Sequence, residues 1–254
     1  MSKDSENTRA GTRLNRAIAS RGVCSRRKAD ELIFAGKVKV NGVAEKNPSR
    51  IAFESDEIEI DGRKIAASIE KVYYMLNKPV HCVSTVKDPQ GRKTVLDLFP
   101  KSIREKRIFP VGRLDYFSEG LLLLTNDGDL AYRLTHPSFE KSKVYEVRLR
   151  DSVPESSLAE MRKGMILSDG TTLAPVKVES RALPRGQTLL IMGLKQGINR
   201  QIRRMCEKFN FTILSLKRIS EGSLRLGDLK SGEYRALSDQ EIAALKDDAK
   251  GDGN

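Results

Sequence analysis

The sequence predicts an α+β protein in which a small N-terminal unit precedes a larger unit with a mainly antiparallel, mixed sheet flanked by helices. The first observation is that predicted strands outnumber predicted helices and that links of hairpin length are common. The second is that residues 63–70 carry no clear periodic pattern and fit a linker, which places the units at residues 9–62 and 71–248. The polar ends, residues 1–8 and 249–254, are expected to be tails.

The first unit is expected to contain two helices followed by two strands. Apolar residues at helical spacing predict a helix that ends at Gly22, and Ser25 can cap a second helix that stops at Gly36. Residues 37–40 and 57–60 alternate polar and apolar side chains, and each segment is followed by an Asn-Gly or Asp-Gly turn signal.

The larger unit is expected to begin with a strand over residues 72–79. The continuous apolar run at 121–125 predicts a central strand, and Asp127 follows it with a turn into a helix that ends at Pro137. The other expected elements are a short helix at 94–99, strands at 143–149, 172–179, 187–194 and 211–218, and helices at 155–163, 199–208 and 239–246, the last capped by Ser238.

Positive charge is concentrated in two segments of the chain, whose 46 Lys and Arg against 34 Asp and Glu give a formal charge of +12. Residues 9–39 hold nine basic and two acidic side chains, and residues 195–218 hold seven and one. Positive charge confined to a few segments is typical of a protein that binds a polyanion. Neither segment resembles a lipid-facing helix, so nucleic acid is favoured over a membrane. Because the chain has no Trp and only 6% aromatic residues, phosphate contacts are expected to dominate.

The composition also excludes several classes of protein. No apolar run is long enough to span a membrane and the N-terminus lacks a secretion signal, so a cytoplasmic protein is expected. The three cysteines and two histidines lie far apart in the sequence, which argues against disulfides and a zinc site. Chemistry in this chain is therefore expected from carboxylates, Tyr, Lys or Arg.

Two segments of the larger unit carry candidate catalytic side chains. Residues 112–120 form a charged, glycine-bounded loop before the central strand, where Asp115 beside Arg113 can stay ionised and act as a nucleophile or base. A local ion pair between these two residues is the simpler interpretation of the loop alone. Lys143 and Tyr145 share one face of a strand and could line a cleft, although a Tyr at such a position is more often part of the core.

A third segment carries clustered arginines. Asn199 follows a glycine and is a candidate N-cap of the next helix. Arg200, Arg203 and Arg204 are spaced to project from one face of that helix. Three neighbouring guanidinium groups repel one another unless an anion lies between them, so a phosphate or an internal carboxylate is expected there.

In the first unit, residues 12–17 (Thr-Arg-Leu-Asn-Arg-Ala), 22–29 (Gly-Val-Cys-Ser-Arg-Arg-Lys-Ala) and 36–42 (Gly-Lys-Val-Lys-Val-Asn-Gly) follow in order. Their spacing resembles that of the S4 RNA-binding domain. A small helical hairpin with a solvated face would explain the apolar pattern, but not the basic residues gathered at both helix starts, where helix dipoles also attract phosphate. The residues expected to contact RNA here are Arg13, Arg26, Arg27, Lys28 and Lys37.

The larger unit carries three motifs in order: Gly-Arg-Leu-Asp at 112–115 with Glu-Gly at 119–120, Lys-x-Tyr at 143–145, and Gln-Gly-Ile-Asn-Arg-Gln-Ile-Arg-Arg-Met at 196–205. With the first unit, they resemble the bacterial ribosomal pseudouridine synthases of the small-subunit synthase A family over residues 12–246. Segments that resemble the large-subunit branch of that family, synthase B most closely, are 77–79, 88–92 and 94–98.

This resemblance implies the isomerisation of one RNA uridine to pseudouridine without a metal or an organic cofactor. By motif, Asp115 is the catalytic carboxylate, Tyr145 stacks on the target base and assists the final proton removal, and Arg203 pairs with Asp115 and keeps it ionised. Arg113 is expected to fill the gap left by the flipped nucleotide. The other residues expected to bind RNA are Lys143, Asn199, Arg200 and Arg204.

The expected partner is ribosomal RNA, 23S rather than 16S, free or within a ribosomal particle, and the protein is expected to act as a monomer. The same reaction on 16S RNA is an alternative. A non-catalytic assembly factor that binds ribosomal RNA is another, although it leaves most of the larger unit without a role. A metal-dependent nuclease that uses Asp127 and Asp129 is the least favoured.

Overall fold

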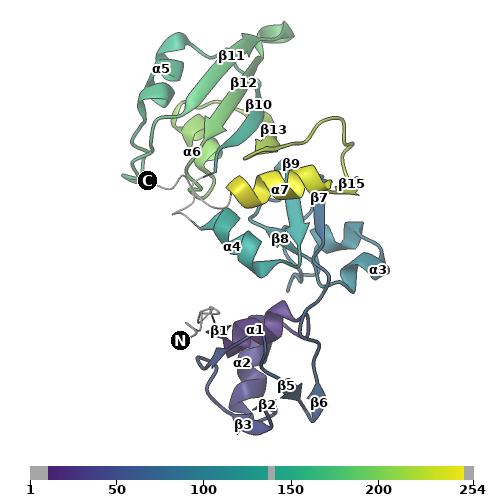
Figure 1. The fold of residues 1–254 in the computed structure, drawn as a ribbon. Helices are drawn as coiled ribbons and strands as arrows, with labels where there is room; N and C mark the ends of the chain where they lie inside the picture. Colours follow the sequence, from purple (N-terminus) through teal and green to yellow (C-terminus); the bar gives the residue numbers. More distant parts are fainter. Residues whose placement is uncertain (1–10, 137–140, 249–254) are drawn as a thin grey trace, which may run out of the picture. The chain divides into compact units, whose positions relative to one another are not determined.

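The structure, a computed structural model, describes residues 11–136 and 141–248 (Figure 1). It divides the chain into two compact units that meet between Lys71 and Val72. No helix in these described ranges is long and apolar enough to cross a membrane.

The small unit packs two helices against a four-stranded sheet in the order β3-β2-β5-β6, with β1 and β4 forming a separate pair. Ile18, Ile33 and Ile58 are fully buried in its core. The predicted cap is confirmed, because the Lys28 amide donates to Ser25 Oγ (3.2 Å). The elements are β1 (Thr12–Arg13), α1 (Leu14–Ser20), α2 (Arg26–Phe34), β2 (Val38–Val40), β3 (Val43–Glu45), β4 (Ile51–Ala52), β5 (Ile58–Ile60) and β6 (Arg63–Lys64).

The small sheet extends into the segment that we expected to be a linker. Asp61 and Gly62 both have positive φ and turn the chain back on itself. Residues 63–64 consequently pair with β5 as β6, and Ile65 packs against the core of the small unit.

The larger unit is built on a nine-stranded sheet with the main order β11-β12-β10-β13-β9-β7-β15, to which β14 adds on β13 and β8 on β9. Every pairing is antiparallel except that of β9 with β13, so the predicted mainly antiparallel, mixed sheet is confirmed. The strands are β7 (Tyr73–Lys78), β8 (Phe109–Val111), β9 (Glu119–Thr125), β10 (Lys143–Leu149), β11 (Lys177–Ala182), β12 (Thr188–Leu194), β13 (Ile213–Glu221), β14 (Leu224–Arg225) and β15 (Tyr234–Ala236).

Helices cover the two halves of this sheet differently. Next to β10 and β12, α5 and α6 bury Leu158, Met161 and Met205 on one face. On β7 and β9, α4 and α7 bury Leu130 and Leu245, and α7 crosses these strands in Figure 1. The helical segments are η1 (Val95–Leu98), α3 (Lys101–Arg104), α4 (Gly128–Thr135), α5 (Glu155–Lys163), η3 (Pro184–Gly186), α6 (Gln201–Lys208) and α7 (Asp239–Asp248).

Some predicted elements of the larger unit were wrong in their extent. The strand expected at 172–179 runs instead from Lys177 to Ala182, because Pro175 lacks an amide hydrogen for a ladder and only Thr172 forms an isolated bridge, to Ile166. The strand expected at 211–218 begins at Ile213 and ends at Glu221. Sequence reasoning missed α3, β8, β14 and β15, and the helix end expected at Pro137 lies outside the described residues.

Candidate active site

Asp115 lies in a tight turn between β8 and β9, and this turn is anchored by a buried lysine. Lys78, the last residue of β7, has no exposed surface, and its Nζ donates to the carbonyl oxygens of Pro79 (2.9 Å), Asp115 (3.1 Å) and Ser118 (2.8 Å). Burial lowers the pKa of Lys78 to about 8. The Ser118 amide also donates to the Asp115 carbonyl (3.0 Å), which closes the turn.

A second loop, which follows β7, holds the Asp115 turn from another side. Ser84 Oγ donates to the Leu114 carbonyl (2.9 Å) and accepts from the Leu114 amide (3.2 Å). The His81 amide donates to the Tyr116 carbonyl (2.8 Å). Main-chain atoms on both sides of Asp115 are therefore fixed before any substrate binds.

Two arginines from the start of α6 face the Asp115 carboxylate. Arg203 Nε lies 3.5 Å and Arg200 Nη1 lies 3.6 Å from Asp115 Oδ2. The Arg203 side chain is 17% exposed, against 51% for Arg200 and 29% for Asp115. Arg203 Nη2 also donates to the Phe117 carbonyl (2.9 Å) and to Ser118 Oγ (3.0 Å), so its guanidinium is fixed on the turn that carries the carboxylate.

Tyr145 lies near this pair in the middle of β10, opposite Arg218 of β13 and Met192 of β12. Its side chain is partly buried and packs against the apolar clusters on both sides of the β9–β13 junction. Burial raises the pKa of Tyr145, the charge of Arg218 opposes the rise, and the carboxylates of Glu221 and, to a smaller extent, Asp115 add to it. The phenol is consequently protonated at neutral pH.

Arg218 is a fully buried cation behind Tyr145. Its Nε donates to the Leu121 carbonyl (2.7 Å) of β9, and its Nη2 lies 3.2 Å from Glu221 Oε2. Burial opposes the charge of Arg218, but Glu221 and Tyr145 outweigh it and raise the pKa. The residue thus links β13 to β9 directly beneath the site.

The structure brings Asp115 together with Arg200 and Arg203, and it packs Tyr145 against the apolar cluster that contains Leu114, the residue before Asp115. Arg113 is exposed, and it is not among the described cations within 4 Å of Asp115, which are Arg200 and Arg203. The simpler interpretation of the loop, a local pair between Arg113 and Asp115, is therefore wrong.

Other expectations for this segment need correction. Asn199 is exposed and does not cap α6; the N-cap is Arg200, which has φ 51° because the chain turns there, with the Gln201 amide bonded to the Ile198 carbonyl (3.2 Å). Arg204 does not share the face of Arg203, because it pairs with Asp169 and donates to Thr171 Oγ1 (3.0 Å).

Three of the lysines expected to bind RNA lie near carboxylates of the protein. Lys143 Nζ lies 3.8 Å from Glu221 Oε1, so part of its charge is balanced within the protein. In the small unit, Lys28 pairs with Glu31 (2.8 Å) and Lys37 with Asp61 (3.4 Å). The exposed arginines there include Arg13, Arg26 and Arg27.

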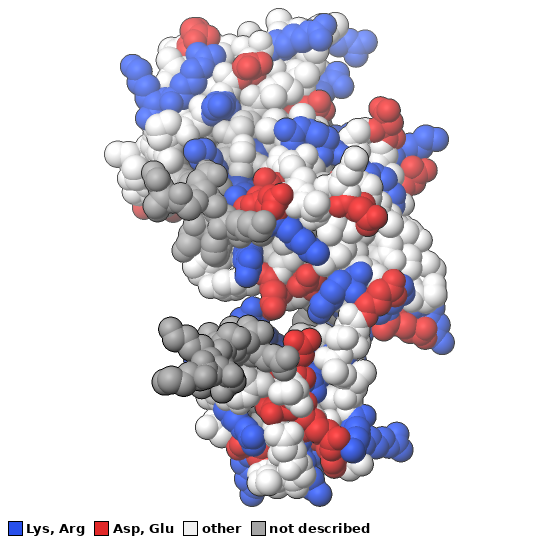
Figure 2. Space-filling model, in the orientation of Figure 1, with Lys and Arg blue, Asp and Glu red and all other residues white. Residues whose placement is uncertain are grey.

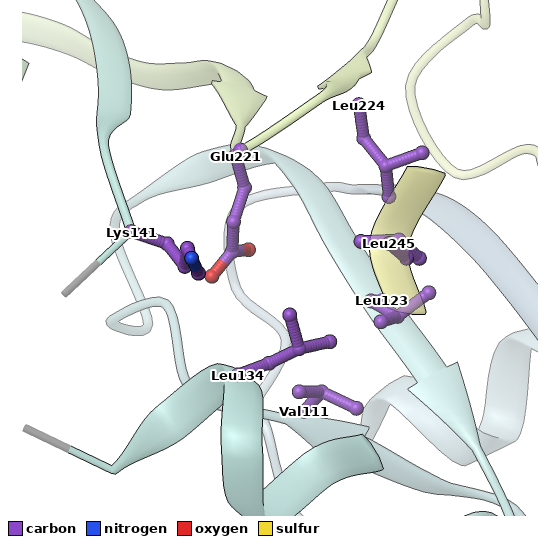
Figure 3. A pocket seen from close by; sticks show the side chains of 8 residues that line it. Val111, Leu123, Leu134, Lys141, Glu221, Leu224 and Leu245 are labelled. Atoms are coloured by element: carbon purple, nitrogen blue, oxygen red, sulfur yellow. The ribbon is translucent and has the colours of Figure 1, made fainter. Parts of the chain in front are cut away.

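Basic and acidic side chains are interspersed over the face shown in Figure 2. In the larger unit, an open cavity of about 430 Å³ borders the counterions of Asp115 and is lined by Arg200, Arg203, Glu207 and residues 210, 211 and 213. A second cavity, of about 10 Å³, lies in the apolar core between α4, α7 and the sheet, where Val111, Leu123 and Leu245 converge (Figure 3). It has room for one water at most and no link to Asp115.

Among the described residues, no group of three or more His, Cys, Asp or Glu side chains could hold a metal ion. Asp127, proposed above as a metal ligand, instead caps α4, where its Oδ1 accepts from the amides of Asp129 and Leu130 (both 3.2 Å). Its Oδ2 accepts from the Tyr73 hydroxyl (2.9 Å).

Sequence reasoning missed Lys78 and Arg218 as supports of the site. A lysine at the end of an otherwise apolar strand, directly before Pro79, is a usable signal for a buried cation with a special role. Arg218 gave no such signal, since its basic segment suggested a solvated or RNA-facing residue.

Comparisons with known proteins identify the family to which this chain belongs. Residues 72–208 match the family model for RNA pseudouridylate synthase, and residues 12–58 match that for the S4 domain. The chain belongs to the RNA pseudouridylate synthase family and carries an S4 domain, as the motifs predicted. It is therefore an RNA pseudouridine synthase.

Individual relatives resemble the chain over nearly its whole length. The chain is 42% identical over 236 residues to ribosomal large subunit pseudouridine synthase B of Bacillus subtilis (strain 168), covering 92% of this chain and 95% of the relative. An uncharacterized RNA pseudouridine synthase of Aquifex aeolicus (strain VF5) is 39% identical, with 92% and 93% covered. A crystal structure of a pseudouridylate synthase superposes with a TM-score of 0.65 at 30% identity, covering 92% of this chain and 99% of that one, which confirms the predicted α+β fold.

Proposed function

We propose that this protein isomerises one uridine of 23S ribosomal RNA to pseudouridine with Asp115 as the catalytic carboxylate. The observation that carries the proposal is the pair of guanidinium groups, from Arg200 and Arg203, within 3.6 Å of an Asp115 carboxylate whose turn is fixed by Lys78. The similarity to a large-subunit synthase supports 23S RNA, and the same reaction on 16S RNA is the second candidate.

The reaction breaks the N1–C1′ bond, rotates the uracil and forms a C5–C1′ bond. C5 then gives up its proton and N1 takes up a proton, so substrate and product contain the same atoms. Asp115 acts by attacking the ribose or the ring, or by taking a ribose proton. Each route requires a carboxylate held in a fixed position, and the neighbouring guanidinium groups and the turn provide that.

The remaining groups of the site support this chemistry. Tyr145, partly buried against the cluster that holds Leu114, stacks on the extruded uracil and assists the final proton removal. Arg203 pairs with Asp115 and is its fixed counterion. Arg113, exposed on the same loop, enters the space that the flipped nucleotide leaves.

Other contacts hold the RNA. Arg13, Arg26 and Arg27 of the small unit are exposed cations that bind phosphates near the target. Arg200, Asn199 and Lys143 contribute in the larger unit. The reaction needs no cofactor, and we expect a cytoplasmic monomer that acts on free RNA or on a ribosomal particle.

The test is pseudouridine mapping on transcribed 23S and 16S RNA incubated separately with purified protein and chelator. We expect a single modified uridine in 23S RNA, no product with Asp115→Ala, and unchanged product with Asp228→Ala, which removes an exposed carboxylate of the same unit. RNA that is bound but never modified would instead indicate an assembly factor. Product with Asp115→Ala would remove Asp115 from the mechanism, and product only in 16S RNA would reassign the substrate.

A further inference from the structure

In the larger unit, the two aromatic rings that follow Asp115 form a cluster with a ring from the loop after β7. The Phe117 ring centroid lies 5.0 Å from that of Tyr116 and 5.5 Å from that of His81, and the His81 and Tyr116 centroids are 5.2 Å apart. All three pairs meet edge to face, at angles between 78° and 87°. We call His81, Tyr116 and Phe117 the aromatic cluster.

The main chain that carries the cluster is held by hydrogen bonds, and the Phe117 ring is exposed to solvent. Its main chain is fixed because the Tyr116 carbonyl accepts from the His81 amide (2.8 Å) and the Phe117 carbonyl accepts from Arg203 Nη2 (2.9 Å). Phe117 nevertheless remains 58% exposed and belongs to none of the apolar core clusters. A fixed and exposed aromatic ring is the arrangement that stacks on a planar ligand at a low cost in conformational entropy.

The surroundings indicate which ligand fits. Phe117 is two residues from Asp115, and its carbonyl and the Asp115 carboxylate contact the same guanidinium, that of Arg203. Arg113 and Arg200, both exposed, supply positive charge on the same loop and at the start of α6. An aromatic face bordered by cations suits a nucleobase with its phosphates better than an apolar protein segment.

We infer that the Phe117 ring of the aromatic cluster stacks on an unpaired base that flanks the target uridine. This inference rests on the proposed function, since it requires RNA at Asp115. It assigns to residues 116–117, which lie between the Asp115 and Glu119 motif positions, a part in choosing the RNA: the site favours targets whose neighbouring base is free to leave its own stack.

The test combines a protein variant with an altered RNA. A stem-loop spanning the modified uridine, identified by the mapping above, is made with a single abasic nucleotide at each flanking position in turn. We expect Phe117→Ala to weaken binding of the intact stem-loop by roughly 5- to 100-fold, and one abasic position to cause a similar loss with the wild type. On that abasic RNA, Phe117→Ala should cause no further loss, since both changes remove the same contact.

Three further variants sharpen the result. Phe117→Trp should bind like the wild type and Phe117→Leu should not, because a planar face is required rather than apolar area. Tyr132→Ala is the matched control, since Tyr132 is 52% exposed on α4, which packs on the opposite face of the sheet from Leu114 and the Asp115 turn.

Unchanged binding by Phe117→Ala, or a loss that is equal on every abasic RNA, would overturn the inference. Failure of the proposed function would look different, because the wild type would then form no pseudouridine in any RNA.

Discussion

At the scale of single residues, the Asp115 carboxylate meets both of its counterions most closely through the same oxygen, Oδ2. Two cations on one side of the carboxylate leave its other oxygen available for substrate. The two arginines are not equivalent, because Arg203 also bonds to the Phe117 carbonyl and Ser118 Oγ, whereas Arg200 is half exposed. We therefore assign the fixed counterion to Arg203 and the exchangeable one to Arg200.

Arg203→Lys tests that assignment. An ammonium cannot reach the carboxylate and both groups of the turn together, so we expect kcat to fall by roughly 100-fold with little change in KM. Single-turnover pseudouridine formation is the measurement. Arg200→Lys is the control and should mainly raise KM; equal losses of kcat in the two variants would contradict the distinction.

Lys78 gives a prediction about pH. Burial lowers its pKa to about 8 from a usual 10.5, so between these values the unfolded chain holds a proton that the folded chain has released. Stability contributed by this residue therefore increases as pH rises through that range. We expect urea unfolding to show that the free energy of unfolding of the wild type, relative to that of Lys78→Met, rises from about pH 8 to about pH 10. Lys93→Met, at an exposed position, should show no such trend, and a constant difference for Lys78→Met would refute the prediction.

At the scale of elements, the site depends on the approach of β9 to β13. Lys217 pairs with Glu119 and Arg218 with Gly120, the one parallel contact in the sheet within the described chain. Gly120 has φ +106°, and a Cβ there would lie 2.3 Å from the Arg218 carbonyl oxygen. A side chain at this position would separate the two strands.

Gly120→Ala is accordingly expected to destabilise the protein by roughly 3 kcal/mol or more, since it combines backbone strain with a steric clash. Gly128→Ala is the control, because an added Cβ in α4 meets nothing within 4 Å and Ala favours a helix more than Gly, so the protein should be unchanged or stabilised by up to about 1 kcal/mol. Thermal or urea unfolding of both variants measures the difference. A near-native Gly120→Ala protein would show that the strands can move apart without loss of stability.

The elements also show how far sequence could predict this molecule. Local chemistry predicted the Ser25 cap and the central strand β9, because each depends on residues close in sequence. The motifs predicted that Asp115 and Arg203 would lie together. The buried roles of Lys78 and Arg218 were not predictable, since carbonyl oxygens from distant turns and strands satisfy these cations. The separation of Arg204 from Arg203 was missed for the same reason, because Asp169 lies 35 residues away in the sequence.

At the scale of the whole molecule, the chain joins an RNA pseudouridylate synthase domain to an S4 domain. The larger unit holds the candidate chemistry, and the small unit presents Arg13, Arg26 and Arg27 to solvent. We expect the small unit to contribute RNA affinity and the larger unit to contribute turnover.

Salt dependence of RNA binding separates these contributions. Arg26→Ala and Arg27→Ala should each reduce the slope of log K against log salt by about one unit, because each removes one phosphate contact. Arg63→Ala, at an exposed position on β6, is the control and should leave the slope unchanged. Equal slopes for all of these proteins would place the RNA elsewhere on the small unit. Turnover at saturating RNA should be the same in every variant.

The short ladder between β9 and β13 has one more consequence. Asp115 follows β8 on one side of this ladder and Arg203 lies in α6 on the other, while main-chain pairing between the two sides, in the ranges described, is limited to two residue pairs. Within the described chain, the two halves of the sheet are therefore joined in the main chain by this short ladder. The side-chain contacts of Arg203 with the Asp115 turn and of Arg218 with the Leu121 carbonyl therefore add to this short main-chain connection between the two halves of the sheet.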